Sequence, residues 1–405
     1  MAGEDVCARP VDRAVAVPVT RSLSGSLAAS LAIVAGLELG GAALLRALLL
    51  SNETWVIVGL FVILGVGFAI LQIRPQIEER IVAAFRQARP LALLLAAVLV
   101  LAYPFLMQGS SYALHLLIMA QLYSVLALAL NFQLGSANIP NFATAASYGI
   151  GAYTSALLAI HFGISVWLTL PAAAITATIF GFALGFPAMR TRDTYLALVT
   201  IAFGIVVHQL LNNFTWTGGP NGLAGIPAPT ILGHSFNSPL VVFGHRLPSQ
   251  ANFYYLAALL VLITIVSARL LHNSRVGLAW NALRSDELAA RCQGINVVWY
   301  KMLAFAVDAF LAAFAGSVYA FYVSYIAPDN FTFLVSVMIM TMVIVGGMDN
   351  TLGVIVGAFL LILLPEKLRI FDDFRLLFVG ITVIMFLLLR PQGLFPQRPR
   401  NYGDG

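Results

Sequence analysis

The chain has 405 residues, of which 60% are hydrophobic and only 10% carry a charged side chain. A soluble domain carries roughly 25% charged residues, so these charges are too few to cover a water-facing surface, and the composition indicates an integral membrane protein. The excess of 22 Lys and Arg over 17 Asp and Glu is modest. Because its placement follows a membrane topology, we expect no nucleic-acid partner. Cys7 and Cys292 are too few for a disulfide framework, and we assign them no role.

A membrane-spanning helix needs about 20 mainly apolar residues. The run at 143–162 is rich in Gly, Ala, Ser and Thr, which favours close helix packing or a partly re-entrant path over lipid exposure. We expect an all-α, polytopic transmembrane helical protein with about 10–12 membrane segments, because the last apolar runs are short. The runs lie near 25–45, 54–73, 91–107, 112–133, 143–162, 166–189, 194–212, 252–271, 302–323, 332–347, 352–365 and 375–390.

The first apolar run follows Arg9, Arg13 and Arg21, an arrangement that also occurs in secretory signal peptides. The run contains Glu38, however, and no clear cleavage pattern follows it. We therefore expect a retained membrane helix.

Basic residues in short loops predict the orientation, since cytoplasmic loops are enriched in Lys and Arg. They gather in 74–90, in 190–193, in 271–301 and in the tail from 390 onwards, whereas the long loop 213–250 holds only Arg246. Alternation through twelve spans puts all the basic loops on one face. We expect both termini to be cytoplasmic and the loop 213–250 to be periplasmic. The mixed-charge turn 366–374 falls on the opposite face and is only weak evidence against this orientation.

The periplasmic loop contains "TWTGGPNGLAGIP" at 215–227, which invites comparison with a phosphate-binding loop. Such a loop needs backbone N–H donors and usually a Lys, but this stretch has no basic residue and its prolines remove donors. Gly, Asn and Pro at this density predict consecutive tight turns instead. We expect an ordered external loop that docks a partner through Gly218, Gly219, Pro220, Asn221 and Gly222.

The cytoplasmic loop contains "RVGLAWNALRSDELAARCQGINVVWYK" at 275–301. Ser285 is a good N-cap, Asp286 and Glu287 favour a positive helix end, and Gly294 favours a helix stop. The sequence predicts a short polar helix, either a solvated connector or a coupling helix that docks on a cytoplasmic partner. The residues that would couple this helix to the cytoplasmic partner are Arg284, Ser285, Asp286, Glu287, Ala289, Ala290 and Gly294.

Polar residues inside apolar runs mark packing bridges or pathways, because they are costly in a bilayer. Asp308 lies about two turns into such a run, and Gly135 and Pro140 interrupt the helix near several Asn and Tyr residues. Freed backbone groups there can line a cavity. Two interpretations stay open, a polar substrate path and simple helix–helix hydrogen bonding. The candidate path residues are Asn131, Asn138, Asn141, Tyr148, Tyr153 and Asp308.

Several longer stretches are distinctive in combination: "RTRDTYLALVTIAFGIVVHQLLNNFTWTGGPNGLAGIPAP", "GLAWNALRSDELAARCQGIN", "FAGSVYAFYVSYIAPDNFTF", "IVGGMDNTLGVIVGAFLLILLPEKLR" and "RPQGLFP". Together they resemble the permease family of high-affinity branched-chain amino-acid ABC importers, the LivM type. "LNFQLGSANIPNFATAASYGIGAYTSALL" is a looser match to the family's substrate-path region. "LAARCQG" is similar to the EAA-x-x-x-G loop of importer permeases, with Leu288 in the Glu position and the usual I-x-LP missing further on.

The resemblance covers about residues 112–396 and implies a transport subunit in the bacterial inner membrane, not an enzyme. It implies a second homologous permease, two ATP-binding subunits and a periplasmic solute-binding protein as partners, besides the lipid bilayer. ATP and Mg would act on the partner subunits, so we expect no cofactor on this chain. The family also imports urea, amides and aromatic acids, so the fold leaves the solute open.

The expected domain organisation follows from the part of the chain that the resemblance covers. Residues 1–110 form an N-terminal extension with about three extra transmembrane helices, residues 111–396 form the permease domain, and residues 397–405 form a cytoplasmic tail.

An alternative of another class is a self-sufficient ion-coupled secondary transporter or an intramembrane enzyme. A secondary transporter usually needs charged coupling residues in its core, and only Asp308 is well placed. An intramembrane enzyme needs a nucleophile–base set or a metal motif such as HExxH. The six histidines have no metal-binding spacing, so we expect neither catalytic residues nor a metal site.

Overall fold

The computed structural model describes residues 27–51, 59, 80–81, 83–85, 87–107, 109–188, 193–231, 233–242, 245–367 and, near the C-terminus, 377, 380–381, 383–384, 388 and 393–395. The expected spans near 54–73 and 375–390, the basic turn at 190–193, the tail 397–405 and Cys7 lie wholly or mostly outside the described residues. The chain divides into two compact units, residues 1–102 and 103–405.

The first unit contains α1 (Leu27–Leu50) and most of α4 (Arg89–Leu106), both long and apolar enough to cross a membrane. The Ser30 hydroxyl donates a 2.8 Å hydrogen bond to Gln87 Oε1. Alanine side chains near residue 88 also pack against α1. The apolar cluster at this contact consists of Val34, Ala84, Ala88 and Ala92.

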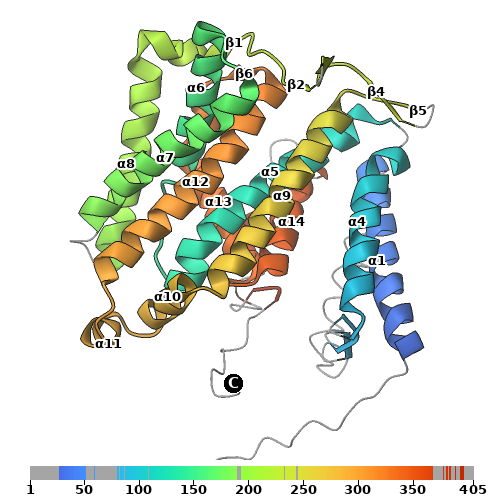
Figure 1. Cartoon of the computed structure of the whole chain (residues 1–405), viewed down its shortest axis with the longest axis horizontal. Helices are drawn as coiled ribbons and strands as arrows, with labels where there is room; N and C mark the ends of the chain where they lie inside the picture. Colours follow the sequence, from blue (N-terminus) through green and yellow to red (C-terminus); the bar gives the residue numbers. More distant parts are fainter. Residues whose placement is uncertain are drawn as a thin grey trace, which may run out of the picture. The chain divides into compact units, whose positions relative to one another are not determined.

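The second unit is a bundle of long helices with a few short strands (Figure 1). Its helices are α5 (Ser111–Asn131), α6 (Thr144–Phe162), α7 (Val166–Ala188), α8 (Asp193–Asn213), α9 (Gln250–His272), α10 (Arg275–Ser285), α11 (Glu287–Cys292), α12 (Val297–Val323), α13 (Phe333–Gly346) and α14 (Thr351–Lys367). A π-helix, Phe132–Ser136, continues α5, and short 3-10 turns lie at Thr215–Thr217, Gly219–Asn221 and Pro328–Phe331.

The strands form three separate two-stranded antiparallel pairs. β1 (Leu223–Ala224) pairs with β6 (Tyr325–Ile326), far away in the sequence. β2 (Thr230–Ile231) pairs with β3 (His234–Ser235), and β4 (Leu240–Val242) pairs with β5 (His245–Leu247). They lie at the end of the bundle opposite to α10 and α11 (Figure 1).

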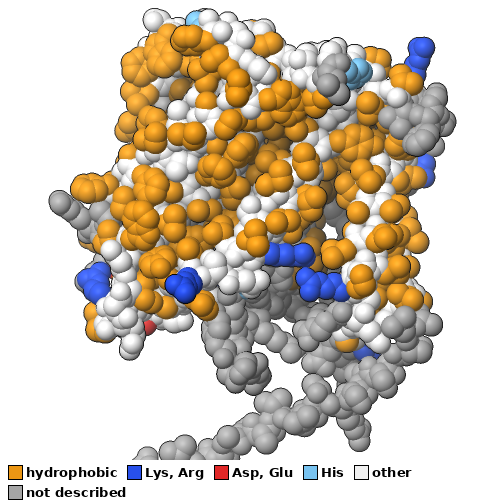
Figure 2. Space-filling model, viewed as in Figure 1, with side chains coloured by type: hydrophobic (Ala, Val, Ile, Leu, Met, Phe, Trp, Pro, Cys, Tyr) orange, Lys and Arg blue, Asp and Glu red, His pale blue; other side chains and the backbone are white. Residues whose placement is uncertain are grey.

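Among the described residues, eight helices are long and apolar enough to span a membrane. Hydrophobic side chains cover most of the second unit between its two ends (Figure 2), as lipid contact requires. The expected all-α, polytopic transmembrane fold is thus confirmed. α6, which is rich in small residues, is instead largely buried against α7 and α12.

α12 forms the centre of one half of the bundle because small residues let α6 approach it closely. Gly151 lies against the backbone of Ala313, and Gly316 lies against the carbonyl of Tyr148. The Ser155 hydroxyl donates to the Ser317 hydroxyl at 2.5 Å across the same contact. In the other half, α5 packs against α9 and α14.

The α6–α12 contact gives a first prediction. A methyl group at Gly316 would overlap the carbonyl oxygen of Tyr148, so Gly316→Ala should push the helices apart and cost about 1–3 kcal/mol. The measurement is the thermal unfolding midpoint of the detergent-solubilised protein. Gly36→Ala in α1 is the matched control, because no atom lies within 4 Å of its added carbon. Equal midpoints for the two variants would contradict the close packing.

Candidate functional site

The central feature of the second unit is a break between α5 and α6. α5 passes into the π-helix Phe132–Ser136, and the chain is not helical again until Thr144. Gly135 permits this path because an added side chain would collide with Asn131 Oδ1 and with the backbone nitrogen of Asp349. Asn138 adopts a left-handed backbone with φ 55°. The interruption predicted from Gly135 and Pro140 is therefore present.

Three of the amides in the break have hydrogen-bond partners on side chains or backbone. The Ile139 amide donates to the Gln133 carbonyl at 2.9 Å. The Phe142 amide donates to the Thr200 hydroxyl of α8 at 3.1 Å. The Ala143 amide donates to Asn141 Oδ1 at 2.8 Å. Because a bilayer supplies no partners for such groups, the hydrogen bonds allow the chain to leave the helix at membrane depth.

Asn141 and Asp308, two of the predicted path residues, meet directly. The Asn141 amide nitrogen donates to Asp308 Oδ2 and to Gln133 Oε1, both at 2.7 Å. The Thr144 hydroxyl donates to the same Asp308 oxygen at 3.1 Å. Asp308 is 0% exposed, and no hydrogen-bond partner for its other oxygen lies among the described residues. This buried polar centre joins the end of α5, the start of α6 and the middle of α12.

The remaining path candidates lie elsewhere. Tyr148 and Tyr153 form an aromatic cluster around Phe331, with ring centroids 5.0 and 5.8 Å from it. Asn138 is exposed. Asn131 Oδ1 accepts from the Asp349 amide at 2.8 Å. Sequence reasoning missed Thr144 and Gln133. Thr144 opens α6 three residues after Asn141, and the sequence could have identified it as the start of a helix.

The predicted coupling segment consists of two helices, and the predicted N-cap is wrong. Ser285 ends α10, where its hydroxyl donates to the Asn281 carbonyl. Asp286 caps α11 instead, because its extended backbone lets Oδ1 accept from the Leu288 and Ala289 amides at 2.8 and 3.0 Å. Gly294 follows α11 with φ +80°, as expected for a helix stop.

One ion pair holds α11 against α12, and a second lies within α11. Glu287 Oε2 lies 2.6 Å from Lys301 Nζ, and Glu287 Oε1 lies 3.5 Å from an Arg291 nitrogen. Ala290 is buried, whereas Ala289 is exposed and Leu288 is 71% exposed. α11 thus presents a short apolar and basic face to the solvent.

The loop 213–250 is built from tight turns, as predicted. Gly218 and Gly222 have φ values of +82° and +68°, which favour glycine. The Tyr325 hydroxyl donates to the Asn221 carbonyl at 3.1 Å, beside the β1–β6 pair. This pairing fixes the loop to the connection between α12 and α13. Trp216, 60% exposed, projects from the same turns.

Among the described residues, no group of three or more His, Cys, Asp or Glu side chains could hold a metal ion. The arrangement in the second unit consists of a buried, mostly uncharged polar centre and two structured polar ends.

Comparison with known proteins identifies the family. Residues 112–389 match the model of the family described as branched-chain amino acid transport system / permease component. The chain is 38% identical over 325 residues to the high-affinity branched-chain amino acid transport system permease protein LivM of Salmonella typhimurium, and 39% identical over 325 residues to LivM of Escherichia coli. Each alignment covers 76% of this chain and 76% of the relative.

The chain is also 24% identical over 287 residues to the permease protein LivH of Escherichia coli, covering 67% of this chain and 90% of that protein. No solved structure matches. The family match begins in α5 and extends beyond α14, so it includes the break, the buried polar centre and both polar ends. This chain belongs to the family of permease components of branched-chain amino acid transport systems.

Proposed function

We propose that this chain is the transmembrane permease subunit of an ABC importer. It forms, with a second permease, the translocation path for branched-chain amino acids or a related small polar solute such as urea or an amide. The observation that carries the proposal is the 38–39% identity to LivM proteins over 325 residues. The additional similarity to LivH supports pairing between two permeases of one family.

The partners follow from the proposed role. Two ATP-binding subunits with bound ATP and Mg hydrolyse the nucleotide and contact α10 and α11, while this chain binds no cofactor. A periplasmic solute-binding protein docks on the loop 213–250 at the opposite end. The protein lies in the bacterial inner membrane with both termini in the cytoplasm. The apolar bundle between two polar ends supports a spanning arrangement (Figures 1 and 2), and Arg275, Arg284 and Arg291 on α10 and α11 support a cytoplasmic place for that end.

The polar centre at Asn141 is the best candidate for the solute path within this chain. Asp308 is the twelfth residue of α12, and a rise of about 1.5 Å per residue places it roughly 16 Å from the start of that helix. This is about half the thickness of the hydrocarbon core. α6 starts at the same level, so the positive end of its dipole also lies there. Amide and hydroxyl groups at this depth suit brief, weak contact with a zwitterion.

The alternative function is an ion-coupled secondary transporter, which the unpartnered oxygen of Asp308 favours. Co-purification with ATP-binding subunits and solute-stimulated ATPase activity in proteoliposomes test the importer. Uptake by this chain alone, driven by an ion gradient and lost in Asp308→Asn, would instead establish the secondary transporter.

Asn141→Ala should lower uptake by up to about tenfold, because it removes the hydrogen bond to Asp308, and a typical hydrogen bond contributes roughly 0.5–1.5 kcal/mol. Asn141→Leu should be worse, because it also fills the centre with an apolar group. Uptake is measured in vesicles with saturating binding protein and normalised to assembled complex. Asn213→Ala, at the exposed end of α8, is the control. Wild-type uptake in both Asn141 variants would show that the solute path lies elsewhere.

Asn221 should be accessible from outside the cell. In a Cys7→Ser, Cys292→Ser background, Asn221→Cys should react with a membrane-impermeant maleimide in intact cells, because residue 221 is exposed in the outer loop. Native Cys292, exposed on α11 and tested in Cys7→Ser alone, is the control for the opposite face. It should react only after permeabilisation. The reverse labelling pattern would show that the topology is opposite to the proposed one.

Glu287→Lys should impair ATP-driven uptake by about fivefold or more. The change places two like charges where Glu287 and Lys301 now form a 2.6 Å ion pair, so α11 should shift from α12. Glu287→Gln, which removes the charge without reversing it, should be milder. Uptake and co-purified ATP-binding subunit are measured together. Full uptake with normal association in Glu287→Lys would make the segment a simple connector.

A further inference from the structure

The turn between α13 and α14 is enclosed on two sides. Gly135 of the π-helix lies directly against the Asp349 backbone. On another side, the Leu394 and Phe395 amides donate to the Val345 and Gly346 carbonyls at 2.8 and 3.2 Å. Asp349 itself adopts φ +66°, a conformation that costs energy for a residue other than glycine. The surroundings therefore hold this side chain in one place.

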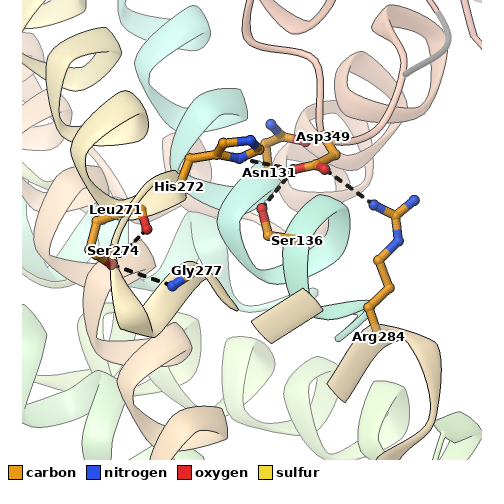
Figure 3. A network of polar contacts seen from close by, with 8 residues as sticks. All are labelled: Asn131, Ser136, Leu271, His272, Ser274, Gly277, Arg284 and Asp349. Atoms are coloured by element: carbon orange, nitrogen blue, oxygen red, sulfur yellow. Dashed lines mark hydrogen bonds and ion pairs between the residues drawn. The ribbon is translucent and has the colours of Figure 1, made fainter. Parts of the chain in front are cut away.

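Asp349 joins three other elements (Figure 3). Its Oδ1 accepts from the Ser136 hydroxyl of the π-helix at 2.7 Å and lies 3.9 Å from His272 Nδ1 of α9. Its Oδ2 accepts from Arg284 of α10 at 3.3 Å. The Asp349 side chain is only 6% exposed, whereas that of Arg284 is 38% exposed. The carboxylate is thus a fixed, buried acceptor, and Arg284 is its partner on the solvent side.

α10 is attached at several other points. The Ser274 hydroxyl accepts from the Val276 and Gly277 amides and donates to the Leu271 carbonyl at 2.7 Å, so it caps α10 against the end of α9 (Figure 3). The Trp280 indole donates to the Tyr300 carbonyl of α12 at 2.9 Å. Arg284 lies in the last turn of α10, two residues before Asp286, the cap of α11. A displacement of α11 can therefore reach Arg284 through this short link.

Space for movement exists beside the contact. A cavity of about 120 Å³ lies next to Asp349 and includes Asn131, Ser136 and His272 among its lining residues. This pocket is partly open, so packing on that side of Asp349 is incomplete. The π-helix is also a rare form that interrupts the regular helix hydrogen-bond ladder. Side chains of the π-helix can shift here without first displacing a packed core.

We propose that Asp349 is a positioning residue for transport, which transmits the position of α10 through Ser136 to the end of α5. The proposal rests on the proposed importer function, in which α10 and α11 receive the movement of the ATP-binding subunits. Because Arg284 is partly exposed, its ion pair is modest in strength and can break and re-form. Ser136 and Gln133 lie on the same π-helix, and Gln133 contacts Asn141 of the polar centre.

The test uses the complete transporter reconstituted in proteoliposomes, and the readout is solute transported per ATP hydrolysed. Arg284→Gln removes the charge from a partly exposed position. It should lower this ratio by about fivefold, within the usual range of coupling between sites. Arg284→Lys keeps the charge and should restore most of the ratio. Asp349→Asn, which keeps an acceptor for Ser136, should resemble Arg284→Gln. Arg89→Gln, exposed at the start of α4 and outside every proposed contact with a partner, is the control and should keep the wild-type ratio.

The outcomes separate the possible failures. A purely structural role would lower transport and ATP hydrolysis together through loss of folded complex, and the ratio would stay at its wild-type value. An unchanged ratio in Arg284→Gln and Asp349→Asn, with a wild-type complex that couples normally, would overturn the proposal for Asp349 alone. A wild-type complex that assembles but shows no ATP-dependent uptake would overturn the importer function instead.

Discussion

The second unit depends on enclosing a non-helical segment inside the membrane. An unpaired backbone amide in hydrocarbon costs several kcal/mol, so a break in a spanning helix survives only where protein surrounds it. Here the Phe142 amide donates to the Thr200 hydroxyl of α8, and the Ala145 amide donates to the Ser336 hydroxyl of α13 at 3.0 Å. These helices must pack against the break for its hydrogen bonds to form. The small residues between α6 and α12 permit the approach on the remaining side.

The two polar clusters along this enclosure differ in their chemistry according to depth. At the middle of α12, Asp308 accepts from the neutral Asn141 and Thr144 side chains. At the end of α5, Asp349 instead pairs with Arg284, whose side chain reaches solvent. A guanidinium is costly at the bilayer centre but tolerable near the surface. The bilayer therefore restricts the charged contact to the end of the bundle and leaves amides and hydroxyls for its centre.

Sequence reasoning found the members of the polar centre better than their pairing. Asn141 and Asp308 stand out as polar residues within apolar runs, but they are 167 positions apart, and periodicity carries no information about such a contact. The break itself was predictable because Gly135 and Pro140 act locally. The π-helix was not predicted, and its Gly135 packs directly against the backbone of Asp349, 214 positions later in the chain.

The segment at 275–301 shows a second limit of the sequence. Ser285 and Asp286 are both favourable N-caps, and only the continuation of α10 through Ser285 decides between them. Asp349 was overlooked for a related reason. The pattern "GGMDN" draws attention to its glycines, of which Gly346 packs against Gly353 of α14 and Gly347 packs against Phe395. The partner Arg284 lies 65 positions earlier in the chain.

The π-helix connects the two clusters by covalent structure. Gln133 contacts Asn141, and Ser136 contacts Asp349, on the same five-residue element. A rotation or tightening of this element moves both side chains together, and the regular α-helix of α5 before it is stiffer than the interrupted ladder. If Asp349 acts as proposed, its movement therefore reaches Asp308 through one short segment, without a change in the packing of α6 against α12. The break would then line the path with polar groups and would also be the place where the bundle changes conformation.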